Sequence, residues 1–365
     1  MSARSPRGHG LRGHSLRGLS VAIAGAGVFG LAVGVALARA GARVILIDPS
    51  PAADNASRVA AGMLAPAFEA LLDPPMAGRF GLLKAARNLW PDFLSEEVGG
   101  PATLRRSRAA WVDRPGAAPM RGAYTAALAA MGARTLPYDG PFGSGSGVAT
   151  TDDWLIDPGA ALARLATELA GLGGLQMAGR GASFDSGLLR MANGDSLRTD
   201  RLVIATGAEP SRLAPELVAL APIKGQLLHF VDAVAGQGGP VIRCAGGYAA
   251  PGAGGLKVGA TMEPGLTDRR PTAAAVEELR ALAVALFPDL TDAPFQPLAG
   301  VRASSPDGLP LVGPSAAPGV MLAVGARRNG WLLAPLVAAI TAAYLAGDDP
   351  GPYARAFDPS RFGPG

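Results

Sequence analysis

The chain has 365 residues, enough for one large domain or two closely joined domains, because a single hydrophobic core stops growing at about 250 to 300 residues. Apolar residues make up 49% of the chain and charged residues 17%, which excludes an intrinsically disordered protein. The net charge is +4, but four arginines lie within the first 17 residues, and no basic stripe with interleaved aromatics follows, which excludes a nucleic-acid binder.

The N-terminal region contains two features that need separate interpretations. Residues 1–18 carry Ser, Arg, Gly and His without apolar periodicity, so we expect a disordered tail. Residues 21–38 are uncharged and mostly apolar, like a signal peptide or membrane anchor, but four glycines divide the run in an ordered spacing. This order predicts instead a strand at residues 21–24, a glycine turn, a helix at about residues 28–40 and a strand at residues 43–48.

The turn of this βαβ unit carries a dinucleotide-binding fingerprint, Gly25-Ala26-Gly27-Val28-Phe29-Gly30. The first glycine permits the tight turn, the second lets the backbone approach a pyrophosphate at the helix N-terminus, and the third lets helix and strand touch. Asp48, 18 residues after Gly30, is expected to accept hydrogen bonds from a ribose hydroxyl, which favours FAD or NAD over NADP. The alternative is a glycine-rich turn that only packs the helix on the strand.

The rest of the chain alternates between two kinds of region. A helical stretch is expected after Pro66 to about residue 98, and proline and glycine interrupt residues 113–119 and 137–147, which indicates an inserted, more β-rich region. Further strands are predicted at residues 202–205, 227–231, 241–244, 255–260 and 320–324, with helices at residues 272–286 and after residue 330. The last helix is long and apolar, but Pro335 and Thr341 interrupt it, so we expect it to be buried rather than to span a membrane.

The counts of cysteine and histidine narrow the chemistry. Cys244 is the single cysteine and only three histidines occur, which leaves no set of ligands for zinc, no intrachain disulfide and little for a Ser-His-Asp triad. We therefore expect no metal site, a reducing cytoplasm, and redox chemistry on a bound cofactor.

Five segments, in order along the chain, identify a family. They are Ala56 to Pro66; Ile204 to Ala208; Tyr248 with Pro251 and Val258 to Glu263; Ala299 to Arg302 with Pro306 to Gly313; and Arg328 to Gly330 with Leu332 to Pro335. From residue 19 almost to its end, the chain resembles the D-amino acid oxidase superfamily and, within it, the glycine oxidases of thiamine biosynthesis. The resemblance implies an α/β fold in which a Rossmann-like FAD-binding domain is interleaved with an α+β substrate domain on a mainly antiparallel sheet. We expect residues 1–18 as the tail, residues 19–90, 141–221 and 298–365 as the FAD-binding domain, and residues 91–140 and 222–297 as the substrate domain.

The resemblance also implies the site residues. Arg302 is expected to bind the substrate carboxylate with two parallel donors, Tyr248 to donate its hydroxyl to the same carboxylate, Arg328 to offer its backbone carbonyl to the amine, and Met262 to wall the pocket with Met63. The alternatives are an ion-paired surface arginine, a tyrosine that only packs, and methionines that fill gaps in the core. The residues expected to hold FAD are Gly25, Ala26, Gly27, Val28, Phe29, Gly30, Asp48, Ser57, Ala61, Gly62, Met63, Thr206, Gly207, Arg302, Arg328, Asn329, Gly330, Trp331 and Leu332.

Some positions depart from the family pattern. Ala326 stands where the family often has histidine, Ala303 where it has proline, and glycine follows Pro251 in place of a basic residue. These departures leave the substrate open. No cysteine lies near the C-terminus, where related sarcosine oxidases attach flavin, so FAD is expected to be noncovalent.

The resemblance implies oxidation of glycine or another small amine by hydride transfer to flavin, followed by release of electrons to oxygen or a carrier. The imine product would supply the thiazole moiety of thiamine. The alternatives are a D-amino acid or N-methyl amino acid dehydrogenase and a noncatalytic flavoprotein subunit. We expect a cytoplasmic protein that contacts neither nucleic acid nor membrane, with self-association left open.

Overall fold

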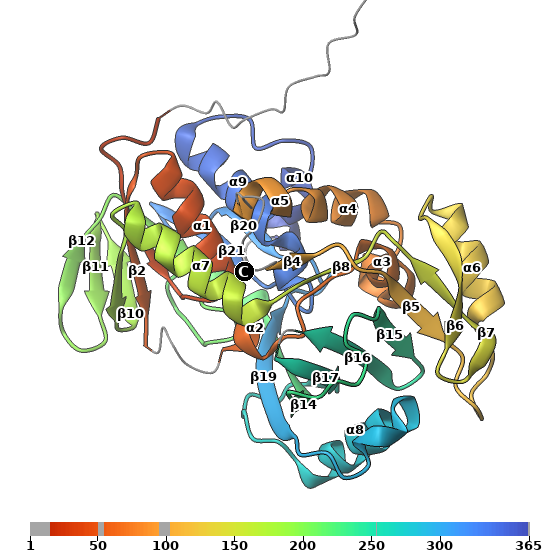
Figure 1. The fold of residues 1–365 in the computed structure, drawn as a ribbon. Coiled ribbons are helices and arrows are strands. Elements are labelled where there is room, and N and C mark those ends of the chain that lie inside the picture. Colours follow the sequence, from red (N-terminus) through yellow and green to blue (C-terminus); the bar gives the residue numbers. More distant parts are fainter. Residues whose placement is uncertain (1–14, 50–54, 95–102, 253, 364–365) are drawn as a thin grey trace, which may run out of the picture.

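The structure, a computed structural model, describes residues 15–49, 55–94, 103–252 and 254–363. Two large sheets organise these residues (Figure 1). The first sheet has six strands in the order β20-β21-β13-β1-β2-β9, parallel except for β20 at one edge. Its strands are β1 (Ser20–Ala24), β2 (Arg43–Asp48), β9 (Leu175–Ala178), β13 (Arg201–Ile204), β20 (Leu311–Pro314) and β21 (Val320–Val324).

Both faces of the first sheet are covered. Successive side chains of a strand point to opposite faces, and the central strands are nearly continuous runs of apolar residues, as expected for a parallel sheet buried on both sides. The side chains on one face of the sheet pack against helices α1 (Val28–Arg39), α7 (Pro158–Gly171) and α9 (Gly330–Ala346). The side chains on the other face pack against a small sheet formed by β10 (Gly181–Asp185), β11 (Leu188–Met191) and β12 (Ser196–Arg198).

The second large sheet is mainly antiparallel, and its nine strands come from three separated parts of the chain. Only β5 and β15 pair in parallel there. The strands are β5 (Ala109–Val112), β6 (Thr135–Gly140), β7 (Gly143–Thr150), β14 (Ala221–Val231), β15 (Val241–Cys244), β16 (Gly247–Gly252), β17 (Gly255–Gly259), β18 (Glu263–Pro264) and β19 (Gln296–Ser304). Helix α8 (Ala273–Leu286) covers one face, where alternate strand residues pack against its buried leucines (Figure 1). The opposite face is turned to the site described below.

Shorter elements connect the two sheets. The helices are α2 (Ala56–Val59), α3 (Pro66–Leu72), α4 (Phe80–Asn88), α5 (Trp90–Leu94), α6 (Arg121–Ala130) and α10 (Ala354–Phe357), with 3-10 turns η1 (Pro74–Met76), η2 (Pro215–Ala219), η3 (Pro288–Leu290) and η4 (Pro359–Phe362). A second small sheet joins β3 (Met63–Leu64), β8 (Trp154–Ile156) and β4 (Leu104–Arg105). Among the described residues, no helix is both long and apolar enough to span a bilayer.

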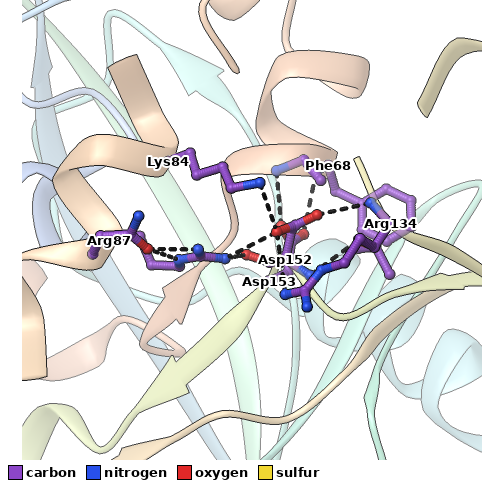
Figure 2. A network of polar contacts seen from close by, with 9 residues as sticks. Phe68, Lys84, Arg87, Arg134, Asp152 and Asp153 are labelled. Atoms are coloured by element: carbon purple, nitrogen blue, oxygen red, sulfur yellow. Dashed lines mark hydrogen bonds and ion pairs between the residues drawn. The ribbon is translucent and has the colours of Figure 1, made fainter. Parts of the chain in front are cut away.

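A buried carboxylate network holds these connecting elements together. The Asp152 carboxylate is fully buried and lies 3.1 Å from Lys84 and 3.6 Å from both Arg87 and Arg134, as Figure 2 shows. Its neighbour Asp153 accepts the backbone N–H groups of Ala67 (2.8 Å) and Phe68 (3.2 Å), which belong to the first turn of α3. Those N–H groups lack partners within the helix, so a carboxylate there anchors α3.

The predicted α/β fold with interleaved regions is confirmed, and the βαβ unit lies where its spacing predicted it. The helical stretch after Pro66 is correct in kind but is broken into α3, η1, α4 and α5, and residues 95–98 lie outside the described residues. Residues 137–147 belong to the hairpin of β6 and β7, because proline and glycine are tolerated at the edge of a sheet.

The expected domain boundaries stay a proposal. The expected boundary at residue 141 falls between β6 and β7, which pair with each other, and the boundary at residue 298 falls inside β19, which pairs with β14. We therefore propose to assign β6, β7, β14 and β19 in full to the substrate domain. Residues 1–14 of the expected tail lie outside the described residues. Leu16, however, is buried in the main core and donates its N–H to Ala40, which corrects the expectation of disorder at that position.

Candidate active site

The glycine turn after β1 has a shape that only glycine allows at two positions. Gly25 has a φ of +110°, and a Cβ there would lie 2.3 Å from the carbonyl oxygen of Ala205. Gly30 lies in the first turn of α1, and a Cβ there would lie 1.8 Å from the carbonyl oxygen of Gly25. The backbone of the turn therefore packs directly on the helix and on the end of β13.

The N-terminus of α1 is held by residues from two other segments of the chain. Helix α1 begins at Val28, and its N-cap, Gly27, has no side chain to satisfy the first N–H groups. Val28 donates its N–H to the Ser57 hydroxyl at 3.0 Å, and Ala26 donates to the Asp48 carboxylate at 2.7 Å. The arrangement matches an anion site at a helix N-terminus with an acidic residue at the end of the next strand.

A cleft of about 790 Å³ starts at this turn and runs toward β19. Its volume lies within the roughly 300 to 1,000 Å³ typical of small-molecule and cofactor sites. The predicted cofactor residues that line it are Gly25, Gly27, Val28, Phe29, Asp48, Ser57, Thr206, Gly207, Arg302, Arg328, Gly330 and Trp331. Ala61, Gly62, Met63 and Asn329 line the adjoining cavity instead. Ala26, Gly30 and Leu332 line neither, because Ala26 and Gly30 support the turn and Leu332 is buried in the core.

The adjoining cavity has a volume of about 360 Å³ and shares the lining residues Ala56, Ala60, Arg302, Arg328 and Trp331 with the cleft, so the two lie side by side. Its floor is one face of the second sheet. Directly paired residues of neighbouring strands project to the same face, and such pairs form a row across the sheet. The row runs through Trp111, Arg243, Tyr248, Gly259 and Leu227.

Arg302 reaches this cavity from β19. Its guanidinium lies over Gly225 on β14, where a Cβ would come within 2.5 Å of Nη1, Nη2 and Cζ. Nη1 lies 3.1 Å from the sulfur of Met262, a residue that is 38% exposed at the rim. The structure therefore brings together Arg302, Tyr248, Arg328 and Met262, the four residues expected to act on the substrate, around one cavity.

Replacing Gly225 with alanine is expected to displace the Arg302 guanidinium and to weaken binding of a substrate carboxylate by at least about tenfold, the loss of about 1.4 kcal/mol. The melting temperature is expected to change little, because the atoms in the way belong to the end of a flexible side chain. Steady-state KM and a thermal melt measure the two effects. Gly252→Ala in β16 is the matched control, since its Cβ meets no atom closer than 3.9 Å, and equal KM values in both variants would contradict the prediction.

A buried carboxylate, Glu69 on α3, organises the arginines on the other side of the cavity. Glu69 is 4% exposed, and its carboxylate lies 2.9 Å from Arg328 Nε and 2.9 Å from Arg243 Nη2. Burial alone would raise the pKa of Glu69, but Arg328 and Arg243 outweigh it and hold the pKa below its ordinary value. Glu69 is therefore ionised and fixes both guanidinium groups.

Tyr248 lies between these arginines and stays protonated. Burial raises the pKa of its phenol, although Arg302, Arg328 and Arg243 act in the opposite direction. A neutral phenol donates a hydrogen bond, as binding of a carboxylate beside Arg302 requires.

Hydrogen bonds fix Trp331 where the cleft adjoins the cavity, and the cavity contains an unused donor. Trp331, at the start of α9, donates its indole N–H to the Ser57 carbonyl at 2.9 Å, and its own carbonyl accepts from Trp90 at 2.8 Å. Asn329 is 3% exposed, and its Nδ2 is buried without a hydrogen-bond partner among the described residues. Buried donors are normally paired, so an orphaned amide on the wall of the cavity fits a missing cofactor or substrate with acceptor atoms.

Sequence reasoning missed two charged residues of the site, Glu69 and Arg243. Glu69 follows Phe68 in an apolar helical segment, and Arg243 stands between Ile242 and Cys244 in a predicted strand. Arg243 could have been found from the sequence, because a single charged residue inside an otherwise apolar strand indicates an unusual environment on the face of the sheet to which it points.

The structure combines a glycine turn at a helix N-terminus, a long cleft and a cavity lined by several arginines. Together these features define a dinucleotide-dependent oxidoreductase. The chain matches the family DAO, FAD dependent oxidoreductase, over residues 20–344, and it belongs to that family. FAD is therefore its cofactor, and the cleft and the orphaned Asn329 amide fit it. No group of three or more His, Cys, Asp or Glu side chains suited to a metal occurs in the part of the chain that the structure describes.

Known proteins with similar sequence or structure include glycine oxidases. The glycine oxidase of Pseudomonas aeruginosa is 28% identical over 92% of this chain and 98% of its own length. The bifunctional protein ThiO/ThiG of Trichormus variabilis is 30% identical over 94% of this chain, which corresponds to 55% of that protein. The crystal structure of glycine oxidase from Geobacillus kaustophilus aligns with a TM-score of 0.80 at 25% identity, covering 93% of this chain and 98% of that one.

Proposed function

We propose that this enzyme oxidises glycine or another small amine or amino acid and releases an imine. The observation that carries the proposal is that Arg302 and Tyr248 line one cavity over a face of the second sheet, and that this cavity shares lining residues with the cofactor cleft. A guanidinium fork and a phenol suit a carboxylate, and an amino acid held by its carboxylate presents its α-carbon to the cleft. The glycine oxidases among the similar proteins support the same substrate class.

The residues of the chain bind and orient the substrate in this proposal. Arg302 and Tyr248 hold the carboxylate, and the backbone carbonyl of Arg328 accepts a hydrogen bond from the neutral amine. FAD, when bound, would supply the acceptor for the hydride of the α-carbon, while the amine gives up one proton, so that the substrate loses two electrons and a C=N bond forms. Water then hydrolyses the imine to the oxo acid and ammonia, and oxygen or a carrier takes up the two electrons.

We propose further that the enzyme works in the cytoplasm and that its imine supplies the thiazole moiety of thiamine. The resemblance to glycine oxidases and the ThiO/ThiG relative support this role. A dehydrogenase for D-amino acids or N-methyl amino acids is the second candidate, because residues 252, 303 and 326 depart from the family pattern.

Anaerobic mixing of the flavin-loaded enzyme with glycine, sarcosine, D-alanine and D-proline tests the proposal. We expect at least one of them to bleach the flavin absorbance, and the substrate that does so fastest identifies the class. Recovery of the colour on admission of air identifies an oxidase, and its absence identifies a dehydrogenase. If the flavin stays oxidised with all four amines and with iminodiacetate, the proposed function is wrong.

A further inference from the structure

Arg243 is a buried guanidinium at the floor of the cavity. It is 3% exposed, and it lies in the row across the sheet between Trp111 and Tyr248, with which it is directly paired. Paired residues of neighbouring strands project to the same face, so the Arg243 side chain shares the cavity face with the Tyr248 phenol. Both residues line the cavity.

The hydrogen bonds of Arg243 leave part of its fork unused. Nη2 lies 2.9 Å from the Glu69 carboxylate and 3.4 Å from the sulfur of Met63. Nε is buried and has no hydrogen-bond partner among the described residues. A guanidinium has five N–H donors in a planar fork, and leaving one unpaired in a buried site is unfavourable, so the site suits a further acceptor such as an oxyanion.

The net charge of the cavity also favours a ligand with a further negative charge. The charged side chains that line it are Glu69, Arg243, Arg302 and Arg328, which sum to +2. Glu69 is shared between Arg243 and Arg328, and a substrate with one carboxylate would engage Arg302. Because the reacting amine is neutral, one positive charge then stays uncompensated in a desolvated site.

We propose that the substrate is an amino acid with a second carboxylate, which binds at Arg243 while the first binds at Arg302. This inference rests on the proposed oxidation of an amino acid and narrows its substrate class; it sets aside glycine and the thiazole role, which need a substrate with one carboxylate. The Arg302 guanidinium lies over β14, and three strand spacings, about 14 Å at the backbone, separate β14 from β15, which carries Arg243.

Two matched pairs of small molecules test the proposal on the wild-type holoenzyme. Methoxyacetate and diglycolate are unreactive ethers with one and two carboxylates, and their dissociation constants follow from the perturbation of the flavin spectrum. Sarcosine and iminodiacetate are the corresponding amines, whose rates of anaerobic flavin reduction give kred/Kd. We expect diglycolate to bind, and iminodiacetate to react, at least about tenfold better than its partner with one carboxylate.

Variants of Arg243 assign the preference to this residue. Arg243→Gln is expected to remove the preference for the second carboxylate, so that diglycolate binds no better than methoxyacetate and iminodiacetate reacts no better than sarcosine, whereas Arg243→Lys, which keeps the charge, retains part of the preference. Arg280→Gln, on the far side of α8, is the control for a general loss of positive charge. If Arg243 had only a structural role, Arg243→Gln would weaken the binding or reaction of all four molecules to a similar extent.

The outcomes separate this inference from the proposed function. If sarcosine or glycine reduces the flavin but diglycolate binds no better than methoxyacetate to the wild type, the second-carboxylate site is refuted and the proposed function stands. The same wild-type comparison decides the question if Arg243→Gln fails to fold. If none of the amines reduces the flavin, the proposed function itself fails.

Discussion

Arg302→Leu is expected to lower kcat/KM for the amino-acid substrate by about 30- to 4,000-fold, because removing one partner of a buried charge pair costs about 2 to 5 kcal/mol. The loss is expected mainly in binding, since the guanidinium is expected to hold the carboxylate in both the ground state and the transition state. Titration with methoxyacetate, followed through the flavin spectrum, measures this binding directly. Arg302→Lys keeps the charge but not the fork and is expected to fall between the wild type and the leucine variant.

Stability is expected to move in the opposite direction from activity in this variant. Burial, and then the neighbouring Arg328 and Arg327, lower the pKa of Arg302, although Tyr248 opposes them, so its charge is unfavourable until a carboxylate binds. Replacing the guanidinium with an apolar side chain is therefore expected to maintain or raise the melting temperature of the substrate-free enzyme. An unchanged dissociation constant for methoxyacetate in Arg302→Leu would show that Arg302 is not the carboxylate site.

The parts of the fold that could be predicted are those set by short-range spacing. The glycine turn, α1 and β2 follow from residues within about 30 positions of one another, and β15 and β21 were predicted with the bounds that the structure has. Arg302 and Tyr248 were found through ordered segments of a resemblance, and the structure brings them to one cavity. Their roles in binding stay predictions.

The interactions that could not be predicted join residues far apart in the chain. Arg243 and Glu69 are 174 positions apart, and their ion pair depends on how α3 packs over the second sheet. The packing of α3 depends in turn on Asp153, which caps it from 85 positions away. No local pattern shows which buried carboxylate meets which guanidinium, so the charge balance of the cavity emerges only from the assembled sheets.

Gly30→Ala is expected to lose bound flavin and stability together. A Cβ at residue 30 would lie 1.8 Å from the carbonyl oxygen of Gly25 and 3.5 Å from the Ala205 side chain, and the first of these atoms is backbone that cannot rotate away. Either the turn or the first turn of α1 must shift, and both shape the cofactor cleft. Overpacking of this kind costs about 1 to 3 kcal/mol or more, and it displaces the N–H groups that face a pyrophosphate.

The matched control for this clash is Gly122→Ala on α6. Gly122 is also a helical glycine, but a Cβ there would meet nothing within 4 Å, so its replacement is expected to stabilise the protein by up to about 1 kcal/mol through helix propensity. The flavin absorbance per chain and the melting temperature distinguish the two variants, and adding FAD is expected to restore little of the flavin to Gly30→Ala. A Gly30→Ala protein that purifies fully yellow and melts like the wild type would mean that the turn does not press against the helix as the structure shows, and the anion site at the start of α1 would lose its physical basis.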